Sequence, residues 1–180
     1  MDVQIFPSNT ELPEYFYYQA MALGRVMWGE SDEYNIDLGV AAPAQHLVIA
    51  QGKRLISYAS IVRVPLEVNG TTYQCLGLGG VMTFPHFRKR GYGTQLVQAA
   101  TQLIREDTSA DIALLWAEPA NHRLYAKHGW EVMPHLITLE GNATSPEPYT
   151  DEPAMMLFLS EKGKSANFER ASVYVGEEKW

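Results

Sequence analysis

The sequence predicts a mixed α/β fold, in which one central sheet of about seven strands is flanked by helices. Residues 46–84 contain three strand patterns joined by tight turns, which indicates an antiparallel meander. Residues 93–117 contain an amphipathic helix pattern followed by a fully apolar strand pattern. Because a helical crossover joins parallel strands, the sheet should be antiparallel at first and parallel in its middle.

The N-terminal part is expected to form a short strand at residues 3–6 and a helix within residues 11–28. The helix is indicated by apolar residues at helical spacing: Leu12, Phe16, Ala20, Leu23 and Met27. A polar, acidic connection follows at residues 29–37. The meander then occupies 46–51, 54–68 and 71–84, and Asn69-Gly70 is the standard signal for a two-residue hairpin turn.

The second half alternates helices and strands. The helix that starts near Gly93 carries Leu96, Ala100, Leu103 and Ile104 on one face. Residues 111–117, "DIALLWA", form an apolar run typical of a strand buried on both faces. A short helix at 121–130, ended by Gly129, is predicted next. Further strands are expected at 131–139, 154–160 and 170–176, with a Pro-rich acidic loop at 140–153.

Length and composition limit the classes of protein. A chain of 180 residues fits one domain, expected to span residues 1–180. The net charge of −7 and pI near 5.2 argue against nucleic acid or an anionic membrane as partner, and are compatible with a cationic substrate. A single cysteine, Cys75, excludes an internal disulfide. The sequence has neither a signal-peptide pattern nor an apolar run of membrane-spanning length, so a cytoplasmic location is expected.

The stretch "FPHFRKRGYGTQL" at residues 84–96 indicates an anion site. It joins a strand to a helix, so helix N-terminal N–H groups point into the loop, where they attract anions. Gly91 and Gly93 allow close approach to the backbone, and Arg88, Lys89 and Arg90 add positive charge. The stretch lacks the Gly-Lys-Ser/Thr of a Walker loop, and its glycine spacing does not fit a dinucleotide fingerprint. The alternative is a solvated basic turn.

Residues 85–93, "PHFRKRGYG", together with "LYAKHGW" downstream, resemble the two signatures of the GNAT superfamily of acyl-CoA-dependent N-acetyltransferases. The resemblance covers about residues 46–135. It implies a fold in which parallel strands 4 and 5 splay apart, with acetyl-CoA as cosubstrate. The pyrophosphate would bind Arg88, Lys89, Arg90, Gly91, Tyr92 and Gly93. The pantetheine arm would pair with the backbone of Val81, Met82 and Thr83, where "GLGG" suggests a bulged strand.

The same resemblance implies that Tyr125 is the general acid that protonates the departing thiolate, and the alternative is a packed helix aromatic. A strand N–H near Met82 would polarise the thioester carbonyl. The general base stays open among Glu118, His122 and a water chain to a distant carboxylate. The histidines show no metal-ligand spacing, so no metal is expected.

Three short segments, "MWGE", "YTDEP" and "GEEKW", resemble the aminoglycoside 2'-N-acetyltransferases. The resemblance implies that acidic groups and the last residue hold a polycationic sugar, at Glu30, Asp151, Glu152, Glu178 and Trp180. Several carboxylates around one cleft would suit several ammonium groups; the alternative is solvated surface acids. Gly79 and Trp116 depart from that family, which has an acidic residue and a serine there.

Three functions therefore remain. The first is acetylation of an aminoglycoside at its 2'-amino group, a reaction that would confer antibiotic resistance. The second is acetylation of another small amine, such as a polyamine or an amino-acid derivative, which Gly79 and Trp116 favour. The third is a non-catalytic acyl-CoA sensor, against which an intact Tyr125 argues. An exposed late strand is also a common route to a homodimer.

Overall fold

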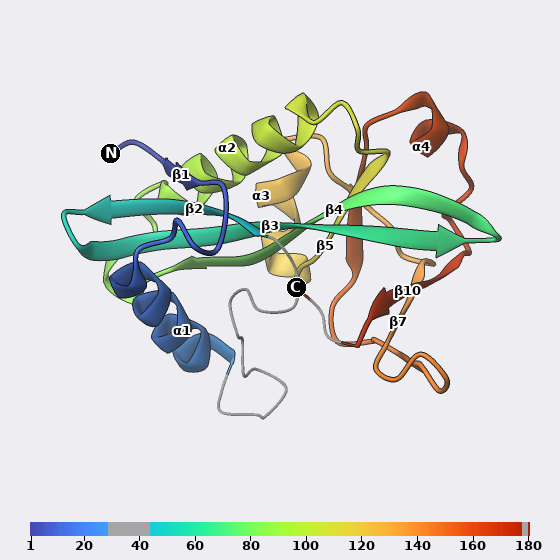
Figure 1. The fold of residues 1–180 in the computed structure, drawn as a ribbon, viewed down its shortest axis with the longest axis horizontal. Helices are drawn as coiled ribbons and strands as arrows, with labels where there is room; N and C mark the ends of the chain where they lie inside the picture. The colour runs from blue at the N-terminus through green and yellow to red at the C-terminus, as the bar shows by residue number, and fades with distance from the viewer. Residues whose placement is uncertain (29–43, 178–179) are drawn as a thin grey trace. The chain divides into compact units, whose positions relative to one another are not determined.

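The computed structural model describes residues 1–28, 44–177 and 180 (Figure 1). The predicted acidic connection at 29–37 lies outside them. The chain divides into two compact units. Unit 1 comprises Met1–Val62 and Leu78–Thr101, and unit 2 comprises Arg63–Gly77 and Gln102–Trp180. Among the described residues, none of the helices has both the length and the apolar character of a membrane span.

Seven strands form one mixed sheet, as the sequence predicts. Their order is β1 (Gln4–Phe6), β2 (Ala44–Gln51), β3 (Arg54–Val68), β4 (Thr71–Thr83), β5 (Ile112–Trp116), β9 (Ala154–Phe158) and β6 (Glu131–Val132). A second sheet has three strands in the order β10 (Ser172–Gly176), β7 (Ile137–Glu140) and β8 (Glu147–Pro148). The expected strand at 170–176 is thus present, but it belongs to this second sheet.

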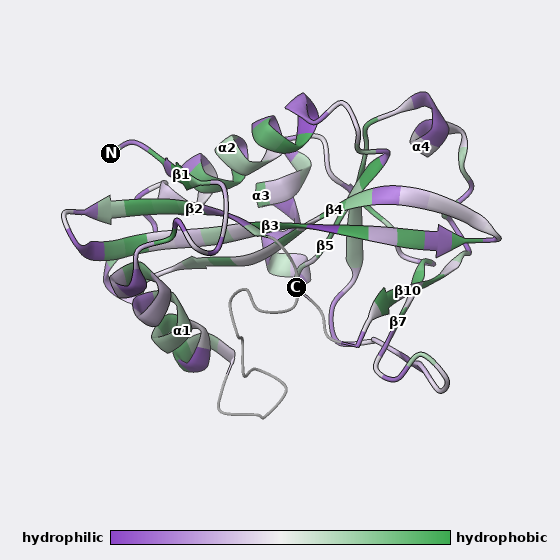
Figure 2. Cartoon of the chain, viewed as in Figure 1, coloured by the Kyte–Doolittle hydropathy of each residue, from purple (hydrophilic) through white to green (hydrophobic). Residues whose placement is uncertain are grey.

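Unit 1 is built on β1, β2 and parts of β3 and β4, with helix α1 (Glu14–Trp28) and the first turns of α2 (Tyr92–Glu106). Figure 1 shows α1 below and α2 above these strands, and Figure 2 shows that both helices carry one apolar and one polar side. The apolar side of α1 packs on the strands through Phe16, Ala20 and Leu23, which are at most 1% exposed. Burial of a side chain the size of Phe or Leu contributes about 1.5–3 kcal/mol, so this helix is held by packing.

The predicted meander is confirmed. β2 pairs antiparallel with β3, and β4 lies next to β3 in the sheet. Asn69 and Gly70 both have positive φ, 52° and 75°, as a two-residue hairpin turn of the primed type requires.

Unit 2 contains the predicted parallel pairing. β4 pairs in parallel with β5 from Cys75↔Ile112 to Gly77↔Leu114, and β5 pairs antiparallel with β9. Ile112 to Leu115 are all at most 1% exposed, which confirms the strand buried on both faces. Helix α3 (His122–Ala126) follows β5, and Gly129 beyond it has φ of 90°, which confirms the predicted glycine stop.

Residues 131–139 do not form the single strand that the sequence predicts. They split into β6 and β7, which belong to different sheets, with a turn between them that contains Pro134. Proline has no N–H to donate to a strand partner, so it ends the ladder there. The predicted loop 140–153 also contains the short strand β8.

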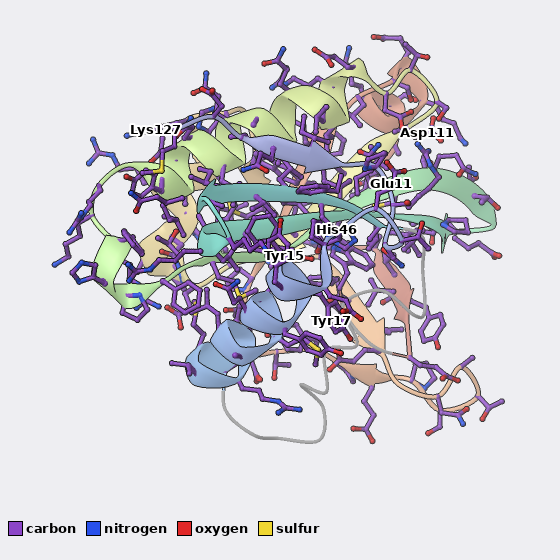
Figure 3. The ribbon with its side chains drawn as sticks, turned by 60° about the vertical axis from the view of Figure 1, so that its left-hand side comes forward. Glu11, Tyr15, Tyr17, His46, Asp111 and Lys127 are labelled. Carbon is purple, nitrogen blue, oxygen red and sulfur yellow. The ribbon has the colours of Figure 1, made fainter. Side chains whose placement is uncertain are left out.

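A short helix that the sequence analysis does not anticipate, α4 (Glu161–Ser165), is capped by Ser160, whose Oγ accepts from the Gly163 N–H at 3.1 Å. The Ser160 hydroxyl also donates to Asp111 at 2.8 Å, and a Cβ on Gly163 would lie 2.2 Å from the Asp111 carbonyl. Asp111 is labelled in Figure 3. The helix is therefore fixed by contacts with a residue 49 positions earlier in the chain.

Candidate acyl-transfer site

The basic loop of unit 1 has the conformation of an anion cradle. A 3₁₀ turn at Pro85–Phe87 ends β4, and α2 begins at Tyr92, next to the predicted Gly93. Lys89 and Gly91 adopt left-handed backbone conformations, with φ of 61° and 85°. Successive residues of alternating handedness turn neighbouring N–H groups toward one point, which suits a phosphate oxygen.

The positively charged side chains of the loop are exposed, and two of them contact residues of the strand and turn that precede the helix. Arg88, Lys89 and Arg90 are all exposed, and the Arg88 Nε donates to the Thr83 carbonyl at 3.0 Å. The guanidinium carbon of Arg90 lies 5.7 Å from the centre of the buried Phe87 ring. That of Arg54, at the start of β3, lies 4.8 Å from the same ring. Sequence analysis missed Arg54, because only the fold brings it to the loop.

The strand segment expected to hold the pantetheine arm is irregular. Gly80 has φ of 58° in the middle of β4, which fits the predicted bulge. Met82 is buried, whereas Val81 and Thr83 are partly exposed. The Ser57 hydroxyl donates to the Met82 carbonyl at 2.7 Å and contacts the Thr83 hydroxyl at 2.8 Å. β3 therefore fixes this segment through side chains.

Tyr125 lies on α3 in unit 2 and is 7% exposed. Burial first, and the negative charge of Glu152 second, raise the pKa of its hydroxyl above the ordinary tyrosine value. The hydroxyl is therefore protonated at neutral pH, the state that a general acid needs.

Neither predicted general-base candidate gains support from its surroundings. Glu118 is exposed and precedes the short 3₁₀ turn Pro119–Asn121. His122 is partly buried, and its Nε2 lies 2.9 Å from the Ala117 carbonyl, which makes Nε2–H a donor to that oxygen. The base stays open.

A second group of side chains in unit 2 combines aromatic rings with a carboxylate. The Tyr149 hydroxyl donates to Glu152 at 3.5 Å, and the Tyr149 ring centre lies 6.1 Å from that of Trp116. The Trp116 indole N–H donates to the buried Thr138 hydroxyl at 3.0 Å. These contacts join Glu152, beside Tyr125, to the Trp116 side chain.

The Trp180 indole completes this group. Its ring centre lies 4.9 Å from that of Trp116, and its buried Nε1 has no hydrogen-bond partner among the described residues. A Cβ on Gly77 would lie only 2.1 Å from the indole, so the indole occupies the space directly over that glycine. We call Trp116, Tyr149, Glu152 and Trp180 the aromatic–acid cluster.

The predicted acceptor residues thus have different outcomes. Contacts within unit 2 link Glu152 to Tyr149, Tyr149 to Trp116, and Trp116 to Trp180. The negative charge of Glu152 also raises the pKa of Tyr125. Asp151 is exposed. Glu30 and Glu178 lie outside the described residues. Sequence analysis missed Tyr149 and Gly77, although Tyr149 stands in the quoted segment "YTDEP".

Solved structures of similar fold include N-acetyltransferases. Escherichia coli YhbS, a GNAT family N-acetyltransferase in complex with CoA, is 18% identical with a TM-score of 0.64, covering 96% of this chain and 88% of its own. An aminoglycoside 6'-N-acetyltransferase complexed with coenzyme A is 13% identical with a TM-score of 0.61, covering 89% and 98%. Escherichia coli ElaA is 15% identical with a TM-score of 0.61, covering 87% and 99%. At these identities the likeness establishes the fold alone.

No curated protein sequence matches the chain at a significant level. The family description "Acetyltransferase (GNAT) domain" matches residues 10–133, which is more than half of the chain and includes both the basic loop and Tyr125. The chain therefore belongs to the GNAT acetyltransferase family and is an acyl-CoA-dependent N-acetyltransferase.

Proposed function

We propose that this enzyme transfers the acetyl group of acetyl-CoA to a primary amine of a small cationic molecule. The observation that carries the acceptor class is the aromatic–acid cluster, in which three aromatic rings contact one another and the carboxylate of Glu152 acts electrostatically on the candidate general acid. An ammonium group is stabilised both by aromatic faces and by a carboxylate. The net charge of −7 favours the same kind of substrate.

In this proposal the basic loop and the end of β4 bind acetyl-CoA. Arg88, Lys89 and Arg90, with the backbone from Gly91 to Gly93, hold the pyrophosphate. The backbone of Val81 to Thr83 holds the pantetheine arm, and an N–H near Met82 polarises the thioester carbonyl. The family match runs from one unit into the other, which supports treating residues 1–180 as a single domain.

Tyr125 is the proposed general acid. Its hydroxyl donates a proton to the departing sulfur while the amine nitrogen forms its bond to the acetyl carbon. Burial raises the pKa of the Tyr125 hydroxyl, so the phenol carries its proton at neutral pH and has one to donate.

The resemblance of the short acidic segments suggests an aminoglycoside, acetylated at its 2'-amino group, as first candidate for the acceptor. One observation favours the second candidate, a smaller amine such as a polyamine or amino-acid derivative. The Trp180 indole lies over Gly77 and against Trp116, and this bulk reduces the room for a large sugar.

Thiol release from acetyl-CoA across aminoglycosides, polyamines and amino acids tests the proposal. Cys75 is buried and burial raises the pKa of its thiol, so a thiol reagent should report released coenzyme A with little background. Turnover only with sugars bearing a free 2'-amino group would support the first candidate, and turnover only with smaller amines the second. Release that no amine stimulates would contradict the proposal.

Tyr125→Phe provides the test of the general acid. We expect turnover to fall roughly a hundredfold, within the range of general acid catalysis, with acetyl-CoA affinity nearly unchanged. Tyr174→Phe is the matched control, since the Tyr174 hydroxyl donates to the Gly141 carbonyl at 2.7 Å in the second sheet. Full activity of Tyr125→Phe would show that Tyr125 contributes to packing and is not the general acid.

A further inference from the structure

A buried chain of polar side chains lies within unit 1, behind the irregular part of β4. His46 on β2 and Tyr58 on β3 are both 0% exposed. The His46 Nδ1 lies 2.7 Å from the Tyr58 hydroxyl, and the His46 Nε2 lies 2.9 Å from the Asn9 amide oxygen. Figure 3 labels His46 in the strand layer where β1 runs beside β2.

The direction of these hydrogen bonds follows from the donors available. Burial lowers the pKa of His46 to about 4, so its ring is neutral near pH 7 and carries one N–H. The Asn9 amide oxygen only accepts, so the proton is on Nε2 and Nδ1 accepts from the Tyr58 hydroxyl. The tyrosine hydroxyl is thereby fixed in both position and orientation.

The other end of the chain meets β4 at its left-handed glycine. A Cβ on Gly80 would lie 3.2 Å from Tyr58 Cε1 and 3.7 Å from the Ser60 hydroxyl oxygen, so both side chains lie close to the Gly80 backbone. The Ser60 hydroxyl donates to the Gly79 carbonyl at 3.4 Å. Tyr58 and Ser60 therefore limit the conformations that the Gly79–Gly80 backbone can adopt.

Burying polar side chains between β2, β3 and β4 costs free energy. Apolar side chains would pack there without any need to satisfy four polar groups, and a buried polar group that loses its partner is strongly destabilising. A fully satisfied network, in exchange, fixes one arrangement. The segment it contacts is a strand with φ of 58° at Gly80, a conformation that an ordinary strand ladder does not enforce.

We propose that Asn9, His46 and Tyr58, acting through Ser60, are positioning residues that hold the Gly79–Met82 segment of β4 in its kinked conformation. The segment's backbone N–H groups are thereby aimed at the acyl thioester. This rests on the proposed assignment of Val81 to Thr83 to acyl-CoA. His46 and Tyr58 are completely buried, so they act through the strand and do not touch the substrate.

The direct test measures amide hydrogen exchange by NMR in the full chain. In Tyr58→Phe, which keeps the ring but loses the hydroxyl, the amides of Gly80 to Met82 should exchange roughly tenfold faster. Amides of Ile112 to Leu114 on β5 serve as the internal reference and should not change. Tyr73→Phe is the matched control, because Tyr73 is a buried tyrosine of β4 in unit 2.

Two variants of His46 separate positioning from general packing. His46→Leu removes both hydrogen bonds and should accelerate exchange at Gly80 to Met82 as Tyr58→Phe does. His46→Asn places an amide oxygen near the former Nδ1, where it accepts from Tyr58, and should recover part of the protection. If a Tyr58 or His46 variant does not fold, Ser60→Ala, which removes the hydroxyl that contacts Gly79 and Tyr58, carries the same expectation.

Kinetics supply the second readout. Turnover should fall roughly tenfold in Tyr58→Phe while the KM for acetyl-CoA stays within about twofold, because misaligned donors weaken the transition state more than cofactor binding. Unchanged exchange at Gly80 to Met82, or acceleration shared equally by Ile112 to Leu114, would overturn the positioning role. If wild type binds no acetyl-CoA, the proposed function fails; if it binds and Tyr58→Phe exchanges normally, only this inference fails.

Discussion

Acidification should unfold this protein partly through His46. The imidazole is 0% exposed, and burial lowers its pKa from 6.5 to about 4. Below pH 6.5 the unfolded chain binds a proton at this histidine, and the folded chain does not until pH approaches 4. Because the unfolded state binds more protons in this window, the free energy of unfolding falls as pH falls from 6.5 to 4.

The magnitude follows from the two pKa values. Their difference corresponds to about 3 kcal/mol once the pH is at or below 4, and to about 2 kcal/mol at pH 5. A domain of ordinary stability has about 5–15 kcal/mol in total, so this one side chain accounts for a measurable share. Protonation of Nδ1 also removes the acceptor of the Tyr58 hydroxyl, which adds to the cost.

The assay is urea unfolding at pH 7.5 and pH 5.0 for wild type and His46→Asn. The variant loses packing at both pH values, so its stability should be lower throughout, but the decrease between the two pH values should be about 2 kcal/mol smaller than in wild type. His135→Asn, which removes an exposed histidine in a turn, should keep the decrease of the wild type. Equal decreases in wild type and His46→Asn would refute the reasoning.

Two further variants test the halves of the site. Arg88→Glu should weaken coenzyme A binding at least roughly tenfold, since it inverts charge at the cradle, whereas Arg25→Glu on the exposed face of α1 should not; calorimetric affinities decide this. Gly77→Ala should displace the Trp180 indole, because the new Cβ would lie 2.1 Å from it. Tryptophan emission should shift to longer wavelength, and adding Trp180→Ala should restore the stability lost in Gly77→Ala; emission and stability unchanged by Gly77→Ala would contradict the contact.

The elements that could be predicted from sequence are those set by local chemistry. Asn69-Gly70 adopts the positive φ values of the predicted hairpin turn, and the apolar run 111–117 is the buried strand. In the loop from 85 to 93, Lys89 and Gly91 are left-handed, and its role as an anion cradle stays a prediction. In each case the residues concerned determine their own conformation.

The elements that were missed depend on distant partners. The helix α4 is stabilised by Asp111, and Arg54 reaches the basic loop only because β3 begins beside Phe87. Pro134 could have predicted that the strand at 131–139 is interrupted. The assignment of β7 to a second sheet, however, depends on its pairing with β10. Tertiary pairing, which no local pattern encodes, decides these features.

The first and last glycines of "GLGG", Gly77 and Gly80, show why the sequence indicates the acyl donor more clearly than the acceptor. Gly80 affects the backbone: its φ of 58° shapes the strand segment whose N–H groups we propose to face the acyl thioester. Gly77 serves a side chain: it leaves room for the Trp180 indole, which in turn contacts Trp116. Backbone requirements leave short, recognisable patterns such as a bulge glycine or a basic loop. The proposed acceptor cluster is instead formed by the side chains of Trp116, Tyr149, Glu152 and Trp180, and Gly77 leaves room for the Trp180 indole. We expect substitutions there to change the substrate more than the fold. The amine must therefore be identified by experiment on this cluster, whereas the acyl donor follows from the strand and loop.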